Sequence, residues 1–144
     1  MSKTVINNLK ELETLAKKLA DAFKKGQCKK VGLIGSLGAG KTAFVGLVAR
    51  ALGYDKNTSS PTFTIMHEYQ TPSGLLLHID LYRLNSKDQE TIAMIRERIE
   101  KADFVLVEWS ERVPALDRMM DITYSLGLGD NTASRIVIIK INKK

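Results

Sequence analysis

The hydrophobic and polar positions near the start of the chain follow the spacing of an amphipathic helix. Five apolar side chains recur every three or four residues: Leu9, Leu12, Ala16, Leu19 and Phe23. This spacing puts them on one helical face and leaves lysines on the other. Asn8 and Glu11 form a capping-box pattern ahead of them, and Gly26 supplies a stop. The pattern predicts an N-terminal helix that packs one face against a core.

A short apolar run at residues 31–34 is typical of a buried strand. A glycine-rich segment follows it, and residues 43–52 then show a second helical pattern, which Gly53 ends. The inner face of that second helix comprises four side chains: Phe44, Leu47, Val48 and Ala51. The pattern predicts a strand, a glycine loop and a helix in direct succession.

The middle of the chain carries the pattern of an antiparallel hairpin. Residues 62–66 alternate enough to predict a strand, and residues 75–79 predict a second one. Pro72, Ser73 and Gly74 supply a short turn between them. Two strands joined this closely pair antiparallel, which a purely parallel sheet would not contain.

The second half of the chain predicts one helix and three strands. Ser86 and Gln89 form another capping-box pattern. The helix after it runs to about Lys101 and points three isoleucines inward: Ile92, Ile95 and Ile99. Three apolar runs predict strands: residues 104–107, 122–126 and 135–141. A flexible loop at residues 127–132 is expected between the last two.

The glycine-rich segment matches G-x-x-x-x-G-K-[ST], the phosphate-loop pattern. Its eight residues are Gly35, Ser36, Leu37, Gly38, Ala39, Gly40, Lys41 and Thr42. Glycines allow positive φ angles and leave room for a phosphate beside the backbone, whose N–H groups then form an anion-binding nest. Lys41 is expected to reach the β- and γ-phosphates, and the Thr42 hydroxyl to bind Mg²⁺. Residues 36–42 are therefore the predicted binding site for ATP or a related nucleoside triphosphate.

These elements predict one α/β domain that spans residues 1–144. The phosphate loop and the hairpin together specify the architecture further. We expect a P-loop NTPase-like three-layer fold, with a mixed parallel and antiparallel central sheet flanked by helices.

Two acidic residues follow predicted strands and are candidates for the metal and for hydrolysis. Asp80 comes after residues 75–79, and Glu108 after residues 104–107. Ligands of open α/β sheets gather at the carboxyl ends of strands, so both acids are expected to face the phosphate loop. One would hold Mg²⁺ beside Thr42, and the other would position the attacking water or accept its proton. The residue pattern leaves open which acid has which role.

Four other residues near these motifs have two interpretations each. Thr62 could contact the γ-phosphate or its metal, or belong to a turn. His78 lies in an apolar strand, where a single histidine is more often a core group than a ligand. Arg83 could neutralise phosphate charge or pair with an acid, and Trp109 is either a core anchor or an exposed contact.

Composition and charge exclude several classes of protein. The contents of 44 % hydrophobic and 26 % charged residues are typical of soluble globular proteins. No apolar run resembles a membrane span or a signal-peptide core. A single cysteine, Cys28, excludes an internal disulfide and fits a cytoplasmic protein. Residues 1–30 carry eight lysines against three acids, so the first helix presents either a surface for tRNA or an acidic protein, or an ordinary solvated face.

Four motifs together resemble the bacterial TsaE (YjeE) family. They are the phosphate loop, Ser60-Pro61-Thr62-Phe63-Thr64, His78-Ile79-Asp80-Leu81-Tyr82-Arg83-Leu84 and Leu106-Val107-Glu108-Trp109. Their order and spacing agree with that family across about residues 31–110. Members of the family are small ATPases required to form threonylcarbamoyladenosine (t6A) in tRNA.

The resemblance implies Mg²⁺-dependent ATP hydrolysis that is weak in the isolated chain and stimulated by partners. Those partners would be the TsaB and TsaD proteins, of which TsaD modifies the adenosine beside the anticodon. A TsaE-like chain would drive or reset the TsaB–TsaD complex between turnovers, with any role of tRNA indirect.

The resemblance also assigns roles to individual residues. By motif, Lys41 and its loop bind phosphates, while Thr42 and Glu108 bind Mg²⁺. Asp80 becomes a hydrolysis residue. Two further positions would sense nucleotide or partner: Thr62 and Trp109.

Three other functional classes compete with this interpretation. A small nucleotide or metabolite kinase would share the phosphate loop, but it commonly needs an arginine-bearing lid. Arg96 and Arg98 alternate with acids in a helix and are typical of a solvated face. A GTPase would need the N-K-x-D pattern, which Asn85-Ser86-Lys87-Asp88 does not match. A non-hydrolysing module, in which ATP only orders a partner surface, is the third class.

Overall fold

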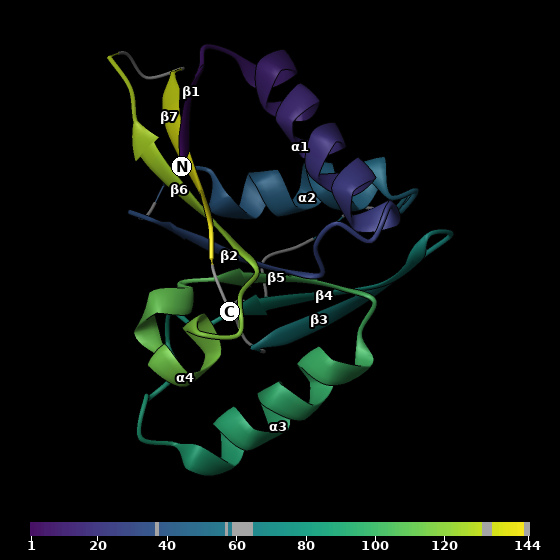
Figure 1. Ribbon diagram of the computed structural model, residues 1–144, viewed down its shortest axis with the longest axis vertical. Helices are drawn as coiled ribbons and strands as arrows, with labels where there is room; N and C mark the ends of the chain where they lie inside the picture. The colour runs from purple at the N-terminus through teal and green to yellow at the C-terminus, as the bar shows by residue number, and fades with distance from the viewer. Residues whose placement is uncertain (37, 57, 59–64, 131–133, 143–144) are drawn as a thin grey trace.

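The fold is a seven-stranded sheet between two layers of helices (Figure 1). The computed structural model describes residues 1–36, 38–56, 58, 65–130 and 134–142. One helical layer contains α1 (Leu9–Lys24) and α2 (Lys41–Ala51). The other contains α3 (Gln89–Lys101), the short α4 (Pro114–Asp117) and the 3₁₀ turn η1 (Ser110–Arg112). The predicted three-layer α/β architecture is confirmed.

The sheet mixes parallel and antiparallel pairs, as predicted. Its strand order is β1-β7-β6-β2-β5-β4-β3, and β6, β2, β5 and β4 run parallel in the middle. The antiparallel pairs lie toward the two edges, as β1 with β7, β7 with β6, and β3 with β4. The strands are β1 (Ser2–Ile6), β2 (Lys30–Gly35), β3 (Met66–Thr71), β4 (Gly74–Asp80), β5 (Phe104–Glu108), β6 (Ile122–Leu128) and β7 (Arg135–Ile141).

The predicted hairpin is present, but its first strand begins later than expected. β3 starts at Met66, where the sequence pattern placed a strand at residues 62–66; residues 62–64 lie outside the described part of the chain. Pairing with β4 sets these bounds, because Met66 lies opposite Ile79 and Thr71 lies opposite Gly74. The length of this strand therefore follows from its partner rather than from its own apolar residues.

One helix cap differs from the predicted one by two residues, and in the other helix the Glu11 contact is shifted by one residue. Asp88, and not Ser86, caps α3, because its carboxylate accepts the Thr91 N–H at 3.1 Å and starts the helix at Gln89. At α1, Asn8 is the N-cap as predicted. Glu11 reaches back one residue further than a capping box requires and accepts the N–H of Asn7 at 3.0 Å.

Strand β1 and the segment after β5 were not predicted from the sequence. In β1 only Ile6 is buried, so the strand carries almost no hydrophobic pattern of its own. It forms because its backbone pairs with β7 from Ser2 to Ile6. Strand β6 also extends to Leu128, into the segment predicted as a loop.

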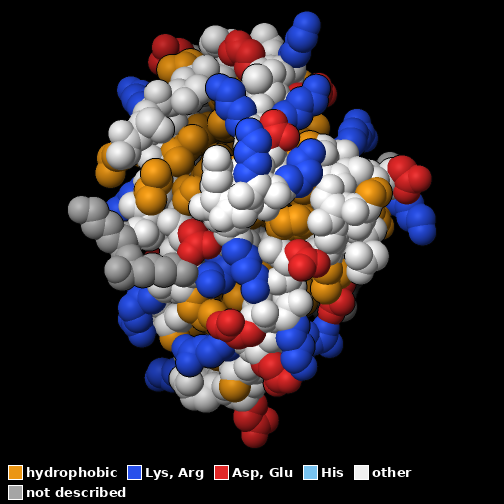
Figure 2. Space-filling view, turned by 45° about the vertical axis from the view of Figure 1, so that its right-hand side comes forward, with side chains coloured by type: hydrophobic (Ala, Val, Ile, Leu, Met, Phe, Trp, Pro, Cys, Tyr) orange, Lys and Arg blue, Asp and Glu red, His pale blue; other side chains and the backbone are white. Residues whose placement is uncertain are grey.

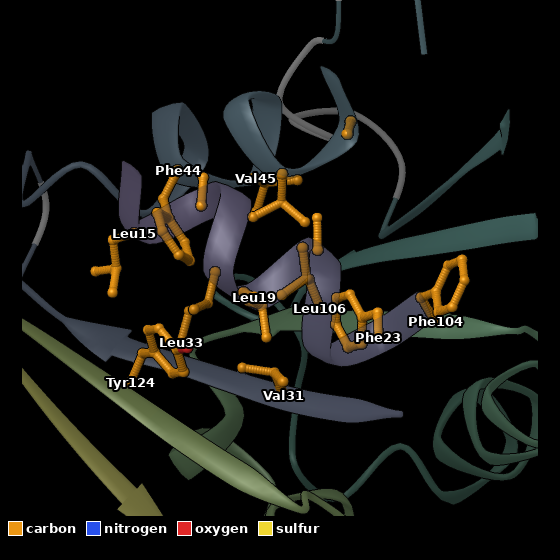
Figure 3. Packing of buried hydrophobic residues seen from close by; sticks show 14 of the residues in the cluster. Leu15, Leu19, Phe23, Val31, Leu33, Phe44, Val45, Phe104, Leu106 and Tyr124 are labelled. Atoms are coloured by element: carbon orange, nitrogen blue, oxygen red, sulfur yellow. The ribbon is translucent and has the colours of Figure 1, made fainter. Parts of the chain in front are cut away.

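The core consists of two apolar clusters, one on each face of the sheet. Beneath α1 and α2, Phe23 stacks on Phe104 at a centroid distance of 5.2 Å, and Phe44 packs against Tyr124 at 5.5 Å (Figure 3). Strand β4 divides its side chains between the clusters, with Leu76 in the first and Leu77 in the second. This alternation decides which residues of β4 can face the phosphate loop.

The lysines of α1 lie on its solvent side, as the helical pattern predicts. All four are exposed (Lys10, Lys17, Lys18 and Lys24), and so is Lys25 at the C-cap. Figure 2 shows basic side chains gathered with a few acidic ones over the upper part of the molecule, where Figure 1 places α1. Contact of this lysine-bearing face with tRNA or with an acidic protein stays a prediction. Among the described helices, none has both the length and the hydropathy needed to cross a membrane.

Replacing Gly35 by alanine should strongly destabilise the fold. Gly35 ends β2 with φ of 147°, and a Cβ there would lie 2.3 Å from the carbonyl oxygen of Leu126 on the adjacent strand. We expect a loss of about 2 kcal/mol or more in the free energy of unfolding, measured by urea titration. Gly127→Ala is the matched control, because the nearest atom to its added Cβ would be 3.8 Å away. Equal stabilities for the two variants would contradict this account.

Candidate functional site

The segment between β2 and α2 has the shape of an anion-binding loop. Gly38 and Gly40 adopt φ of 78° and 101°, which non-glycine residues rarely adopt. A Cβ at either glycine would meet no described atom within 4 Å, so the space beside this backbone is open. Helix α2 begins at Lys41 beside this space with no side-chain cap, and the first N–H groups of a helix have no partner within it. The loop thus offers a phosphate both room and donors.

Lys41 lies at the start of α2 with only 4 % of its surface exposed. Its Nζ donates hydrogen bonds to the carbonyl oxygens of Gly35 at 2.6 Å and Ser36 at 2.9 Å. The same ammonium lies 4.2 Å from the ring centroid of Trp109, a cation–π distance. Burial lowers the pKa of Lys41, and the nearby carboxylates, with Glu108 first, oppose that shift.

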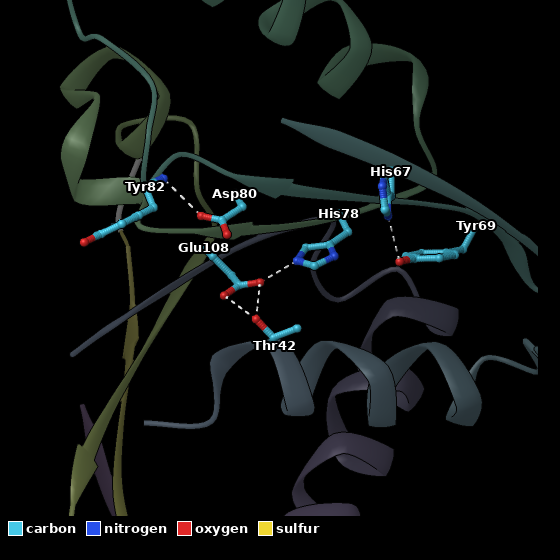
Figure 4. Close-up of polar contacts among 7 residues, drawn as sticks. All are labelled: Thr42, His67, Tyr69, His78, Asp80, Tyr82 and Glu108. Atoms are coloured by element: carbon cyan, nitrogen blue, oxygen red, sulfur yellow. Dashed lines mark hydrogen bonds and ion pairs between the residues drawn. The ribbon is translucent and has the colours of Figure 1, made fainter. Parts of the chain in front are cut away.

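The Glu108 carboxylate is hydrogen-bonded both to the neighbouring strand β4 and to the end of the phosphate loop (Figure 4). Glu108 ends β5 and is almost fully buried. The Thr42 hydroxyl lies 3.0 Å from Oε1 and 3.1 Å from Oε2 of this carboxylate. His78 of β4 approaches the same group, with Nε2 at 2.5 Å from Oε2. Three residues distant in sequence therefore meet at one carboxylate.

Asp80 lies beside Glu108 at the end of the neighbouring strand. The two acids are register partners in the parallel pair of β4 and β5. One Asp80 oxygen accepts the N–H of Tyr82 at 3.0 Å. Burial raises the pKa of Asp80, and the Tyr82 N–H is the main opposing influence. A carboxyl group in such a setting holds a proton more readily than a solvated one.

A cavity of about 280 Å³ connects the loop with both acids. Its walls are Gly38, Gly40, Lys41, Thr42, Ala43, Asp80, Tyr82, Glu108 and Trp109. Among these residues are a cation, a hydroxyl and two carboxyl groups, which are contributed by three separate elements. The sequence-based prediction that Asp80 and Glu108 face the phosphate loop agrees with this geometry.

Trp109 forms one side of the cavity in an unusual backbone conformation. It is the one described non-glycine residue with a positive φ, at 59°. Such a conformation costs about 1–3 kcal/mol and tends to occur at functional sites. The Trp109 ring packs on Tyr82 at 5.0 Å, and the guanidinium of Arg112 lies 5.0 Å from the Tyr82 ring. The half-buried indole thus lines the cavity and also packs against the second apolar cluster.

Arg135, at the start of β7, hydrogen-bonds to the backbone of the phosphate loop, a contact that the sequence did not predict. Its Nε donates to the carbonyl oxygen of Ala39 at 3.2 Å. No motif distinguishes Arg135 from other arginines, because its contact spans 96 positions along the chain. The hydrogen bond of His78 to Glu108 was also missed, since a single histidine in an apolar strand carries no local signal.

The remaining predicted residues are placed as follows. The carbonyl oxygen of Ser36 accepts a hydrogen bond from the Lys41 ammonium, and that of Ala39 accepts one from Arg135. Arg83 is exposed and is not part of the cavity wall. Leu37 and Thr62 lie outside the described residues, so their predicted contacts stay predictions.

The donor set fits a nucleotide phosphate together with a hard cation. Hydroxyl and carboxylate oxygens are the ligands that Mg²⁺ prefers, usually with one or two protein carboxylates and the rest from phosphate and water. Within the described residues, no three His, Cys, Asp or Glu side chains cluster as a metal site on their own. Thr42 and Glu108 could supply one hydroxyl and one carboxylate ligand to such a cation.

Comparison with known structures identifies a protein of the same fold. The crystal structure of Bacillus subtilis YdiB superposes with a TM-score of 0.69, covering 98 % of this chain and 86 % of that one. The sequences are 24 % identical, so this similarity concerns the fold alone.

Comparison with known sequences identifies the family. The chain is 35 % identical to the tRNA threonylcarbamoyladenosine biosynthesis protein TsaE of Aquifex aeolicus, over 97 % of each chain. It is 34 % identical to the protein of the same name from Haemophilus influenzae, over 75 % of this chain and 73 % of that one. Residues 6–136 match the family model described as threonylcarbamoyl adenosine biosynthesis protein TsaE. The chain that carries this loop and these two acids therefore belongs to the TsaE family.

Proposed function

We propose that this protein is a Mg²⁺-dependent ATPase that supports t6A modification of tRNA by driving or resetting a TsaB–TsaD complex. One observation carries the proposal: Lys41, Thr42 and two strand-end acids line a single cavity at a phosphate loop. This is the combination that in-line attack of water on a γ-phosphate requires. The TsaE family to which the chain belongs supports the link to t6A.

Lys41 and Thr42 would bind the nucleotide. The Lys41 ammonium donates to two carbonyl oxygens of its own loop, and phosphate oxygens would replace those weaker acceptors. The Thr42 hydroxyl and the Glu108 carboxylate, already in contact, would hold Mg²⁺ between them and the phosphates. Bound there, Mg²⁺ neutralises the charge that develops on the transferred phosphoryl group.

The geometry favours different roles for the two acids. Glu108 contacts the Thr42 hydroxyl directly, which supports Glu108 as the metal ligand. Among the described residues no hydrogen bond joins Asp80 to Thr42, and the raised pKa of Asp80 suits a group that accepts a proton from the attacking water. Asp80 would therefore be the hydrolysis residue, as the family resemblance implies.

The test of this function is an ATPase assay with and without purified TsaB–TsaD complex. We expect slow turnover by the isolated chain and a clear increase when the complex is added. Consumption of ATP only with a small phosphate acceptor would instead identify a kinase. Turnover that stays slow with the complex, while ATP still promotes binding to it, would identify a non-hydrolysing module.

Lys41→Ala should abolish productive ATP binding. The variant removes the one buried cation of the cavity wall. We therefore expect at least a tenfold loss of affinity for Mg²⁺–ATP, measured by isothermal titration calorimetry. Lys17→Ala is the control, because Lys17 is exposed on α1. If Lys41→Ala binds Mg²⁺–ATP as tightly as the wild type, the assignment of the phosphate site is wrong.

Asp80→Asn should stabilise the protein while removing hydrolysis. Burial raises the folded-state pKa of Asp80 above its ordinary value of 3.8, so the ionised form costs folding free energy at neutral pH. Asparagine keeps the acceptor for the Tyr82 N–H without the charge. The variant should therefore have a higher urea midpoint at pH 7.5. Its advantage should shrink as pH falls through the raised folded-state pKa, and should be lost only well below 3.8, where the wild-type carboxyl is protonated in both states. A lower midpoint at pH 7.5 would contradict the assignment.

Trp109 should report nucleotide binding by its fluorescence. It is the single tryptophan of the chain, and the Lys41 ammonium lies over its ring. Movement of that ammonium to a phosphate would change the indole environment, so we expect a shift in emission that saturates with ATP. Lys41→Ala should lack the shift; an identical shift in that variant would disconnect the indole from the phosphate site.

A further inference from the structure

We propose that His78 is a positioning residue that donates its Nε2–H to Glu108 and thereby orients the carboxylate that takes Mg²⁺. This inference rests on the proposed function, because it concerns the same metal-binding carboxylate. Figure 4 shows the His78 ring directed at the Glu108 carboxylate. Asp80 and Tyr82 lie on the other side of that carboxylate.

His78 occupies a place in the sheet where an apolar residue would otherwise be expected. Its register partner on β5 is Leu106, and two positions earlier on the same strand Leu76 packs in the cluster beneath α1 and α2. His78 has an exposed fraction of 1 %. A polar ring is therefore buried in an otherwise hydrophobic layer, directly below the phosphate-loop helix.

The hydrogen bonds assign the tautomer of this histidine. A carboxylate oxygen accepts, so the Nε2 atom 2.5 Å from Glu108 Oε2 must carry the proton. Nδ1 then has a lone pair, and among the described residues it has no hydrogen-bond partner. An unpaired buried acceptor is unfavourable, and leucine or methionine would avoid it. The bond to Glu108 is thus a polar contact that a histidine supplies here and an apolar side chain cannot, beside the stacking of the ring on Tyr69 at a centroid distance of 6.4 Å.

That bond distinguishes the two oxygens of Glu108. The single hydroxyl proton of Thr42 is shared between Oε1 at 3.0 Å and Oε2 at 3.1 Å, and by itself it would not select one of them. His78 binds Oε2 alone. Oε1 is left with the Thr42 hydroxyl as its hydrogen-bond partner, and it would be the oxygen available to a cation. Outer hydrogen bonds of this kind typically change metal affinity or activity by about 10–100-fold.

Two variants of matched length separate positioning from packing. In His78→Gln the side-chain amide nitrogen can take the place of Nε2 and donate to Glu108. In His78→Met a side chain of similar length fills the space without a donor. His67→Gln is the control, because His67 is the other histidine of the chain and contacts the Tyr69 hydroxyl instead.

The first readout is Mn²⁺ binding, measured by electron paramagnetic resonance with adenylyl imidodiphosphate present. We expect His78→Met to weaken Mn²⁺ binding by about 10–100-fold, and His78→Gln to restore most of the affinity. Binding of the nucleotide analogue in EDTA should stay within about twofold of the wild type in both variants, since Lys41 is untouched. Equal losses for Gln and Met, or a wild-type affinity for Met, would overturn the role of His78.

The second readout does not depend on any ligand. In ¹⁵N NMR of the wild-type protein, His78 should show the Nε2–H tautomer, and Glu108→Gln should change its ring signals while leaving those of His67 in place. An Nδ1–H tautomer would overturn the proposal even if a variant fails to fold. Failure of the wild type itself to bind Mn²⁺ and nucleotide would overturn the proposed function as well, an outcome distinct from loss of the Gln–Met difference.

Discussion

The candidate site depends on the alignment of three parallel strands that end at the same edge of the sheet. β2 delivers the phosphate loop, β5 ends at Glu108, and β4 ends at Asp80. Asp80 and Glu108 are register partners, and Leu33 of β2 is the partner of Glu108 on the other side. A slip of one residue in β5 would turn the Glu108 carboxylate to the opposite face, away from Thr42. Packing on both faces of β5 holds this register, because all five of its residues are buried.

Several polar groups of the site hydrogen-bond to one another within apolar surroundings. Lys41 donates to loop carbonyl oxygens, and Thr42 donates to Glu108. Burial nevertheless lowers the pKa of Lys41 and raises that of Asp80, so each charge is less stable there than in water. A Mg²⁺–phosphate ligand would provide the missing charge balance for both. Under the proposed function, the free-energy cost of removing these charged groups from water is met when the protein folds and not when the ligand binds.

Most of the fold follows from local patterns in the sequence. The phosphate loop, the first helix with its Asn8 cap, and the antiparallel hairpin each have a signal that spans only a few residues. Predictions failed where a long-range partner sets the outcome. Strand β1 exists because β7 pairs with it, and the start of β3 at Met66 follows from its pairing with Ile79. The cap of α3 is a local exception, because Asp88 rather than Ser86 accepts the N–H of Thr91 three residues along the chain.

The sequence by itself determined that a phosphate loop precedes a helix and that two acids end apolar strands. These features are local, because glycine conformation and hydrophobic periodicity act over neighbouring residues. Only the tertiary structure decided that Glu108 and not Asp80 meets Thr42, and that His78 completes the contact. The physical reason is that hydrogen-bond partners depend on strand register and side-chain direction across the sheet, and neither is encoded in any single stretch of chain.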